Sequence, residues 1–296
     1  MATTTETRSK RPTPPFPPQH QKKPGLESKI KPKPEYKASE YKAAGKLKDK
    51  VALITGGDSG IGRAVAVLYA REGADVAITY LPEEESDAQE TAQAVKDEGR
   101  SCLLLKGDLT DPEFCKAIVE KTVQKYGKLD ILISNAAYQN HKKSILDITD
   151  EEWDRTFKTN IYAYFYLVKA ALPYLKPGSC IIATSSETAF YGPATLPDYA
   201  STKGAINTFT MCLAQSLIEK GIRVNAVAPG PVWTPLNIAD EGRTPEEISQ
   251  FGSSQPIHRP AQPDEVAPSY VFLASEADSS YITGIILPVM GGEPVH

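Results

Sequence analysis

Residues 51–62 read VALITGGDSGIG and decide the fold class of this chain. The stretch begins with four apolar residues, enough for a short buried β-strand, and continues into a turn rich in glycine. A helical pattern follows the turn and ends at Gly73. The glycines that shape the turn are Gly56, Gly60 and Gly62. A strand that enters a helix through such a turn is typical of the first unit of an α/β fold.

The same alternation of apolar strands and helical segments continues to the C-terminus. The predicted strands are 51–55, 74–79, 102–105, 130–134, 180–184, 223–227 and 282–289. The predicted helices are 61–72, 86–98, 112–126, 151–175, 198–220 and 263–274. Strands that are apolar on both faces and separated by helices are parallel. The sequence therefore predicts an α/β protein, a Rossmann-type doubly wound parallel sheet of about seven strands in a single domain over residues 48–296.

The first 50 residues differ from the rest in charge and composition. They hold 13 of the 33 Lys and Arg residues and 5 of the 37 Asp and Glu residues, a balance of +8 against −12 in the remaining chain. They also hold 8 of the 24 prolines and almost no apolar periodicity. Such a segment buries too little apolar surface to offset the entropy lost on ordering. We therefore expect residues 1–47 to be a basic, Pro-rich, disordered tail, loosely draped over the domain.

Several classes of protein are excluded by these patterns. No run approaches about 18 consecutive apolar residues, so we expect no membrane-spanning helix. The lysines of the tail stand singly between prolines, with little aromatic interleaving, so we expect no nucleic-acid binding. No apolar core follows the start, which excludes a secretory signal. A mitochondrial transit peptide stays open, because the tail is basic and poor in acids, although its prolines oppose an amphipathic helix.

The four cysteines indicate neither a disulfide framework nor a metal site. They show no CxxC pair and lie in apolar stretches: Cys102, Cys115, Cys180 and Cys212. We interpret them as reduced core residues of a cytoplasmic protein and expect no metal.

The glycine turn is also the first candidate binding site. Ligands of a doubly wound sheet bind beyond the carboxyl ends of the strands. A helix that starts at such a turn offers free N–H groups and the positive end of its dipole to a phosphate. Dinucleotide binding is therefore expected here, and a purely structural turn is the alternative interpretation.

Tyr199 and Lys203 form the second candidate site. They stand four residues apart on a predicted helix and so share one face. A phenol has an ordinary pKa near about 10, too high for efficient proton exchange at neutral pH. A neighbouring ammonium, helped by a cationic nicotinamide ring, would lower that pKa. A surface pair without function is the alternative interpretation.

Several motifs in order resemble the short-chain dehydrogenase/reductase family over about residues 48–292. They are TGxxxGIG at 55–62, Ser134-Asn135-Ala136-Ala137 after a strand, Asn160 in a helix, Ser186 after the next strand, the YxxxK of Tyr199 and Lys203, and PGPVWT at 229–234. The segments TGGDSGIGR, APGPVWTPL and QFGSSQPIHRPAQPDEVAPSYVFLAS resemble a subgroup of general stress oxidoreductases and glucose/ribitol dehydrogenase homologues.

The resemblance implies a catalytic role for each matching residue. Tyr199 would be the general acid for carbonyl reduction and the base for alcohol oxidation, in an NAD(P)(H)-dependent enzyme. Ser186 would hydrogen-bond the substrate oxygen, with Ser185 as the competing serine. Lys203 would hold the nicotinamide ribose and lower the pKa of the phenol. Asn160 would hold a water in a proton relay, and a helix asparagine bonded to backbone is the alternative.

The resemblance also implies a set of cofactor contacts. They are Gly56, Ser59, Gly60, Ile61 and Gly62 at the glycine turn, Asp108 and Leu109 at the adenine, Asn135 at the adenosine ribose, Tyr199 and Lys203 at the nicotinamide ribose, and Val232 and Thr234 at the carboxamide and phosphates. Asp108 is open to a second interpretation, as a residue that starts the helix before Pro112.

The choice between NAD(H) and NADP(H) depends on the end of the second strand. No acid stands there until Glu83, so nothing is expected to repel a 2′-phosphate. The plausible nearby cations are Arg63 and Lys106. NADP(H) is therefore slightly favoured over NAD(H).

The resemblance leaves substrate and partners less defined. A small aldehyde, ketone or polyol is expected, under a long polar lid at 235–260. Candidate pocket walls are Tyr138, Phe190, Tyr191, Trp233 and Phe251. Members of the family are usually tetramers, so a homotetramer or homodimer built through the helices at 151–175 and 198–220 is expected. Two alternatives are a catalytically idle nucleotide-binding regulator and a protein that binds partners through its N-terminal tail.

Overall fold

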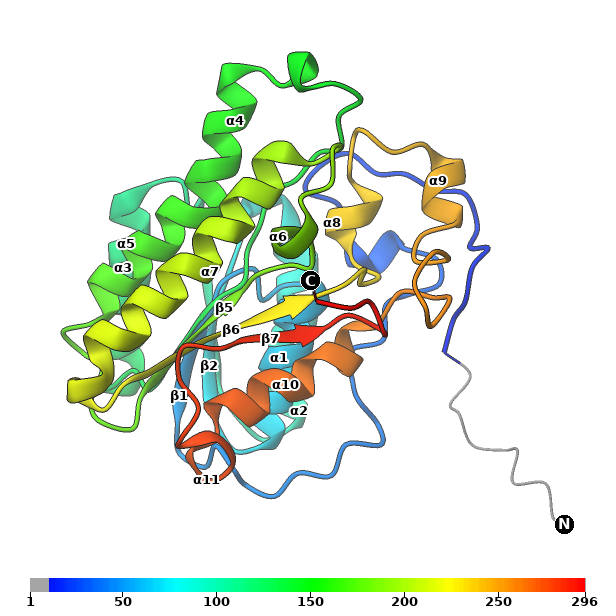
Figure 1. Cartoon of the computed structure of the whole chain (residues 1–296). Coiled ribbons are helices and arrows are strands. Elements are labelled where there is room, and N and C mark those ends of the chain that lie inside the picture. The colour runs from blue at the N-terminus through cyan, green and yellow to red at the C-terminus, as the bar shows by residue number, and fades with distance from the viewer. Residues whose placement is uncertain (1–10, 296) are drawn as a thin grey trace, which may run out of the picture.

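The computed structural model describes residues 11–295, and within them seven parallel strands form one sheet (Figure 1). The strand order is β3-β2-β1-β4-β5-β6-β7. The strands are β1 (Val51–Ile54), β2 (Asp75–Tyr80), β3 (Cys102–Lys106), β4 (Ile131–Ser134), β5 (Cys180–Thr184), β6 (Arg223–Pro229) and β7 (Ile286–Val289). The predicted doubly wound sheet is confirmed.

Helices cover both faces of the sheet (Figure 1). On one face lie α1 (Gly60–Arg71), α2 (Glu85–Asp97) and α10 (Pro263–Ala274); on the other lie α3 (Pro112–Tyr126), α4 (Asp150–Phe157), α5 (Ala163–Ala171) and α7 (Pro197–Leu217). Shorter helices are α6 (Thr188–Tyr191), α8 (Pro235–Ile238), α9 (Pro245–Ser249) and α11 (Glu276–Ser279). Single turns are η1 (Glu27–Lys29), η2 (Pro82–Glu84), η3 (Ile145–Asp147) and η5 (Ile218–Lys220).

Successive residues of the central strand β1 pack alternately into two separate hydrophobic cores, one on each face of the sheet. Ala52 and Ile54 pack into the core beneath α1 and α10, whereas Leu53 packs into the core beneath α3, α5 and α7. Leu53 pairs in register with Ala77 of β2 and Leu132 of β4. A strand buried on both faces must be apolar throughout, which is why 51–54 has no polar residue.

The order of the strands fixes where a ligand can enter. The chain builds outward from β1 to β3, and then returns to the other side of β1 to build β4 to β7. The connections therefore diverge between β1 and β4, leaving a crevice beyond the carboxyl ends of these strands. The glycine turn follows β1 and Asn135 follows β4, so both lie at this point.

Two predicted elements differ from the structure. The helix predicted over 151–175 is broken by a π-helical segment, η4 (Lys158–Tyr162), and ends at Ala171. The strand predicted over 282–289 begins only at Ile286. Before that point the backbone bonds to β6 are interrupted by side-chain bonds, because the Asn225 amide bonds the backbone of Ile282 and Ile285. The apolar pattern of residues 282–289 does not reveal such side-chain bonds, so it predicts a strand that starts too early.

Residues 11–47 form an extended segment, here called the N-terminal strap, that has little regular structure and packs across the domain (Figure 1). The strap places Phe16 and Ile30 in a small third core with Trp233 and the lid helices, and both are nearly fully buried. The ring centroids of Phe16 and Trp233 are 4.1 Å apart. The expectation that this stretch buries little surface is wrong for residues 11–47. The few apolar residues of the strap are buried because they pack against the folded domain. The average composition of the segment does not reveal such contacts with distant residues.

The strap also carries a buried charge to the glycine turn. Glu27 is 0% exposed, and its carboxylate accepts hydrogen bonds from Gly60 N at 2.5 Å and from Arg63 Nη1 at 2.7 Å. Its backbone N–H donates to Asp87 on α2. A buried guanidinium needs such partners, since an unpaired buried charge is costly. Residues 1–10 of the predicted tail lie outside the described part of the chain.

Three of the four cysteines are buried or half-buried, as expected. Cys212 is exposed on α7, which corrects the prediction for that residue.

Among residues 11–295 no helix is both long enough and apolar enough to cross a membrane.

Candidate active site

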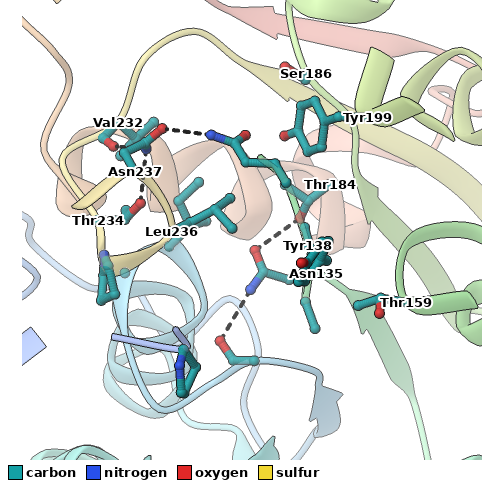
Figure 2. Close-up of a pocket in the computed structure, with 18 of the residues that line it drawn as sticks. Asn135, Tyr138, Thr159, Thr184, Ser186, Tyr199, Val232, Thr234, Leu236 and Asn237 are labelled. Carbon is teal, nitrogen blue, oxygen red and sulfur yellow. Dashed lines mark hydrogen bonds between the residues drawn. The ribbon is translucent and has the colours of Figure 1, made fainter. Parts of the chain in front are cut away.

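A cavity of about 870 Å³ lies at the carboxyl ends of the strands, and its lining includes Tyr80, the glycine turn and the residues after β5. Figure 2 shows some of the side chains that line it. This volume is in the range of ligand pockets. Twelve predicted site residues line it: Gly56, Ser59, Gly60, Ile61, Asp108, Leu109, Asn135, Ser186, Tyr199, Lys203, Val232 and Thr234. Two do not, Gly62 and Asn160. The topology therefore brings together groups from the ends of five strands and from helix α7.

The glycine turn shows why Gly62 belongs to the motif without lining the cavity. A Cβ at position 62 would lie 1.9 Å from the carbonyl oxygen of Gly56. Glycine is thus required for the helix to pack on its own turn. Gly56 adopts φ +61°, in the left-handed region that favours glycine. Together they hold the start of α1 facing the cavity.

Ser186 and Tyr199 lie side by side at the inner end of the cavity (Figure 2). Ser186 follows β5 and Tyr199 stands in the first turns of α7, and the Ser186 hydroxyl is near enough to the phenol to lower its pKa in part. The competing Ser185 donates instead to Asn207 Oδ1 at 2.5 Å, toward α7. Ser186 is therefore the hydroxyl that can share a substrate oxygen with the phenol.

Lys203 approaches the phenol from one turn further along α7. Its ammonium donates to the carbonyl oxygen of Thr184 at 2.7 Å and lies 5.2 Å from the centroid of the Tyr199 ring. Both side chains are buried, at 1% and 7% exposure. The predicted i, i+4 pair is thus formed, and it faces the cavity rather than solvent.

Burial dominates the protonation of this pair. It raises the pKa of Tyr199 above its ordinary value and lowers the pKa of Lys203 to about 7. The expected lowering of the phenol pKa is not found in the protein alone, because desolvation of the buried phenol outweighs the lowering influence of the Ser186 hydroxyl. The protonated phenol is the form that a general acid requires.

Asn160 lies behind the site, in the π-helical segment. Its amide donates to Tyr138 O at 2.9 Å and to Thr202 Oγ1 at 3.0 Å, and its oxygen accepts from Tyr138 N at 2.7 Å. The amide thereby holds the backbone of Tyr138, which follows β4. This agrees with the alternative interpretation of Asn160 as a helix asparagine bonded to backbone. Its oxygen keeps one lone pair, so the water-relay role stays a prediction. π-Turns are frequent at functional sites.

Asn135 joins the glycine turn to β5. Its amide donates to Thr55 O at 3.0 Å and Gly56 O at 3.2 Å, and its oxygen accepts from Thr184 Oγ1 at 3.1 Å (Figure 2). The network fixes the spacing between the turn and the strand that carries Ser186. Asn135 therefore both lines the cavity and sets its width.

Asp108 lines the cavity, but its carboxylate is already engaged. It accepts from Thr110 N at 2.9 Å and from Arg155 Nη1 at 2.8 Å. The residue that caps α3 is Asp111, whose side chain accepts from Glu113 N. The second interpretation, in which Asp108 starts the helix, is therefore wrong. The adenine contact stays a prediction.

Sequence reasoning missed two acids at the adenosine end. Asp58 and Glu84 both line the cavity beside the end of β2. Burial raises the pKa of both carboxyls, and the charge of Asp58 raises that of Glu84 further. Asp58 belongs to the glycine turn and not to β2, so the residues at the end of β2 alone do not reveal it.

The two cations considered for a 2′-phosphate are both engaged elsewhere. Arg63 is 0% exposed and bonded to Glu27, and Lys106 forms an exposed ion pair with Glu85 at 3.2 Å. Neither lines the cavity. Neither cation is therefore free to meet a phosphate at the end of β2.

The strap and the lid complete the other walls. Lys23 and Pro24 of the strap line the cavity, and the Lys23 ammonium lies 4.8 Å from the Tyr138 ring centroid. Of the five aromatic residues proposed as walls, Tyr138, Tyr191 and Phe251 line the cavity. Trp233 does not, because it is fully buried against Phe16, and Phe190 is not among the lining residues. No motif near Lys23 and Pro24 in the sequence indicates that the strap lines the cavity.

The chain is similar to known proteins over nearly its full length. A family model described as enoyl-(acyl carrier protein) reductase matches residues 56–293. General stress protein 39 of Bacillus subtilis (strain 168) is 57% identical over 272 residues, 92% of this chain and 93% of that protein. NADPH-dependent aldehyde reductase 1, chloroplastic, of Arabidopsis thaliana is 49% identical over 278 residues, 92% of this chain and 96% of that protein.

A solved structure has the same architecture. The crystal structure of a short chain dehydrogenase from Burkholderia cenocepacia J2315 in complex with NADP superposes with a TM-score of 0.77 at 33% identity. The alignment covers 83% of this chain and 98% of that chain.

Proposed function

Because the chain belongs to the short-chain dehydrogenase/reductase family and is a nicotinamide-nucleotide-dependent oxidoreductase of carbonyls and alcohols, we propose that Tyr199 exchanges the proton of that reaction. The single observation that carries the assignment is the buried phenol beside the Ser186 hydroxyl, at the inner end of the cavity. The nucleotide, when bound, supplies or accepts the hydride.

The protein's own part is to hold and protonate the substrate oxygen. Ser186 donates a hydrogen bond to that oxygen and stabilises the charge that develops on it. Tyr199 gives its proton to the oxygen during reduction and takes it back during oxidation. Lys203, with its pKa lowered to about 7, exchanges a proton at neutral pH and restores the phenol. The lid helices α8 and α9 exclude water from the inner end.

A nicotinamide dinucleotide fits the residues present. The Gly56–Gly62 turn opens the start of α1 to a pyrophosphate, since N–H groups at a helix start bind phosphate. Asp58 Oδ2 is buried without a hydrogen-bond partner among residues 11–295, and a ribose hydroxyl would supply one. Val232 and Thr234 would hold the nicotinamide carboxamide, Asn135 the adenosine ribose, and Lys203 the nicotinamide ribose.

The assignment is tested by turnover of a carbonyl panel. Short aldehydes, ketones and hydroxyaldehydes are offered with NADH and with NADPH, and nucleotide oxidation is followed by absorbance. We expect turnover of at least one class of carbonyl. Tight nucleotide binding without turnover of any member would instead favour the catalytically idle regulator.

We infer that the chain takes both nucleotides and that Asp58 and Glu84 set their ratio. The NADP complex at 33% identity and the NADPH-dependent relative support the slight preference for NADP(H) that the sequence suggests. Asp58 acts against it, because its ionised carboxylate attracts a ribose 2′-hydroxyl and repels a 2′-phosphate. Burial raises the pKa of Glu84 to about 8, so near neutral pH that carboxyl is mostly protonated and can donate a hydrogen bond instead. NADP(H) preference therefore stays a prediction, and its extent depends on these acids.

The variant Asp58→Asn measures their effect. Removing one charge near the 2′-position is expected to raise the affinity for NADPH relative to NADH about tenfold. The readout is equilibrium titration of each reduced nucleotide by its fluorescence. Asp97→Asn, an exposed acid on α2, is the control and should leave the ratio unchanged. An unchanged ratio in Asp58→Asn would show that this carboxyl does not face the ribose.

Assembly and compartment stay predictions. A homotetramer or homodimer through the predicted helices is supported by large apolar side chains that α4, η4, α5 and α7 leave partly exposed, namely Trp153, Tyr162, Phe165 and Met211. A cytoplasmic location continues to rest on the cysteine pattern of the sequence.

A further inference from the structure

A short part of the N-terminal strap, residues 23–27, touches several walls of the cavity in which the nucleotide is proposed to bind. Lys23 and Pro24 line the cavity directly. Gly25 packs against the end of α8, in the lid. Glu27 accepts a hydrogen bond from Gly60 N at the start of α1. The strap therefore runs from the lid to the glycine turn and borders the nucleotide cavity on the way.

Gly25 allows the strap to approach the lid closely. Its φ is +84°, in the left-handed region that favours glycine. A Cβ on Gly25 would lie 3.0 Å from the Cβ of Ala239 and 3.4 Å from that of Pro235. A larger residue would push the strap away from α8. The close approach brings Lys23, two residues earlier, to the cavity wall.

The Lys23 side chain is held on the segment that follows β4. Its ammonium donates to Gln139 O at 2.6 Å and lies 4.8 Å from the centroid of the Tyr138 ring. An ammonium has three N–H donors, and among residues 11–295 this is the hydrogen bond that Lys23 makes. Its other donors are therefore available to a ligand in the cavity that Lys23 lines.

Neighbouring acids do not fully compensate the charge of Lys23. The carboxylates whose charges act on it are those of Asp240, Glu241 and Glu152. Asp240 and Glu152 each bond another basic side chain at 2.6 Å. Burial of the ammonium outweighs all three charges and lowers the pKa of Lys23. The ammonium would therefore gain from an anion bound in the cavity.

The other lysine and arginine side chains that line the cavity within residues 11–295 have different surroundings. Arg155 is paired with Asp108 at 2.8 Å. Lys203 lies at the inner end beside the proposed proton donor, and Arg243 belongs to the lid between α8 and α9. The start of α1 offers N–H groups but only a partial positive charge. Lys23 thus remains as the full positive charge for a phosphate at the crevice between β1 and β4.

We propose that Lys23 binds the diphosphate bridge of the nicotinamide nucleotide, so that the strap forms part of the nucleotide site. This proposal rests on the placement of the nucleotide proposed above. The bridge is a better match than an anionic substrate, because Lys23 is held beside β4, whereas the Ser186 that would hold the substrate follows β5. Each phosphate of the bridge carries a negative charge that an ammonium meets with a charge-assisted hydrogen bond.

The test is the affinity of NADH and of NADPH for wild type, Lys23→Met and Lys23→Arg, measured by equilibrium titration of nucleotide fluorescence. Both nucleotides carry the same bridge. Lys23→Met should therefore weaken both by the same factor, at least about tenfold, the loss of a hydrogen bond between charged partners. Lys23→Arg keeps the charge and should regain part of the affinity.

Lys31→Met is the matched control. Lys31 is an exposed lysine of the same strap, outside the cavity lining, so its replacement removes the same charge and should leave both affinities unchanged. With saturating nucleotide, Lys23→Met should keep the wild-type KM for the carbonyl. A higher KM with unchanged nucleotide affinity would assign Lys23 to the substrate. Weaker binding of NADPH alone would assign it to the 2′-phosphate, and either result would overturn the proposal.

A measurement on the wild type distinguishes the contact from mere detachment of the strap in a variant. Hydrogen exchange of the backbone amides of residues 19–29 is followed without ligand, with saturating AMP and with saturating ADP-ribose. AMP carries a single phosphate and ADP-ribose carries the bridge. Because binding and strap docking are linked reciprocally, ADP-ribose should slow the exchange more than AMP does. Equal exchange with the two ligands would contradict the proposal.

Failure of this proposal differs from failure of the proposed function. If Lys23→Met binds both nucleotides as wild type does, the role of Lys23 is wrong while the oxidoreductase assignment stands. If wild type binds neither nucleotide, the placement of the nucleotide fails, and the role of Lys23 is overturned with it.

Discussion

Replacement of Tyr199 by phenylalanine is expected to lower kcat at least about 100-fold, with nucleotide affinity unchanged. The phenol is the proposed proton donor, and its ring is almost fully buried, so Phe keeps the packing and removes only the hydroxyl. The Ser186 hydroxyl remains, but an ordinary serine is a far weaker acid. The measurements are steady-state turnover of a carbonyl substrate and equilibrium titration of the reduced nucleotide.

The matched control for this variant is Tyr281→Phe. Tyr281 is fully exposed and lies outside the cavity lining, so turnover should stay at the wild-type value. Near-normal turnover in Tyr199→Phe would contradict the assigned acid. A large loss of nucleotide affinity in the same variant would assign the phenol to binding rather than to proton transfer.

Removal of the Phe16 ring is expected to be the most destabilising single change in the strap. Phe16 packs on Trp233, and the strap backbone is tied to α9 by bonds between Phe16 and Ser249 of 2.8 and 2.6 Å. Phe16→Ala should cost about 3–5 kcal/mol, as for other buried phenylalanines. Because Trp233 packs beneath the lid, we also expect a higher KM for the carbonyl substrate.

Fluorescence reports on this region directly, because the chain has two tryptophans. In a Trp153→Phe background, urea titration follows Trp233 alone. Lys22→Ala, an exposed change on the same strap, should stay within about 0.5 kcal/mol of wild type. If the Phe16→Ala curve superposes on that of wild type, the strap does not support the lid.

Deletion of the N-terminal strap tests the alternative that this segment serves a partner. Strap residues contact the lid, the glycine turn and α10, where Glu35 bonds the backbone of Asp264. A chain that lacks residues 1–45, and with them these contacts, should therefore lose stability and substrate affinity together. Unchanged values of both would leave the segment free for a partner and favour that alternative.

The pattern of the sequence was sufficient for the sheet and for the order of its motifs. Runs such as 51–54 and 180–184 are apolar throughout because they are buried on both faces, and this requirement is local in the chain. The same holds for Gly62, whose need follows from one turn and the helix after it. Cavity-lining residues at strand ends followed from topology, since parallel strands present their carboxyl ends at one edge.

What the sequence determined by itself is thus the fold class, the glycine turn and the i, i+4 pairing of Tyr199 with Lys203, all of which depend on residues close together in the chain. Tertiary structure alone decided the docking of Phe16 on Trp233, the engagement of Arg63 by Glu27, and the place of Lys23 in the cavity wall. These contacts join segments far apart in the chain. Their energies come from burial and desolvation, which exist only once the domain has closed around them, so no local pattern could report them.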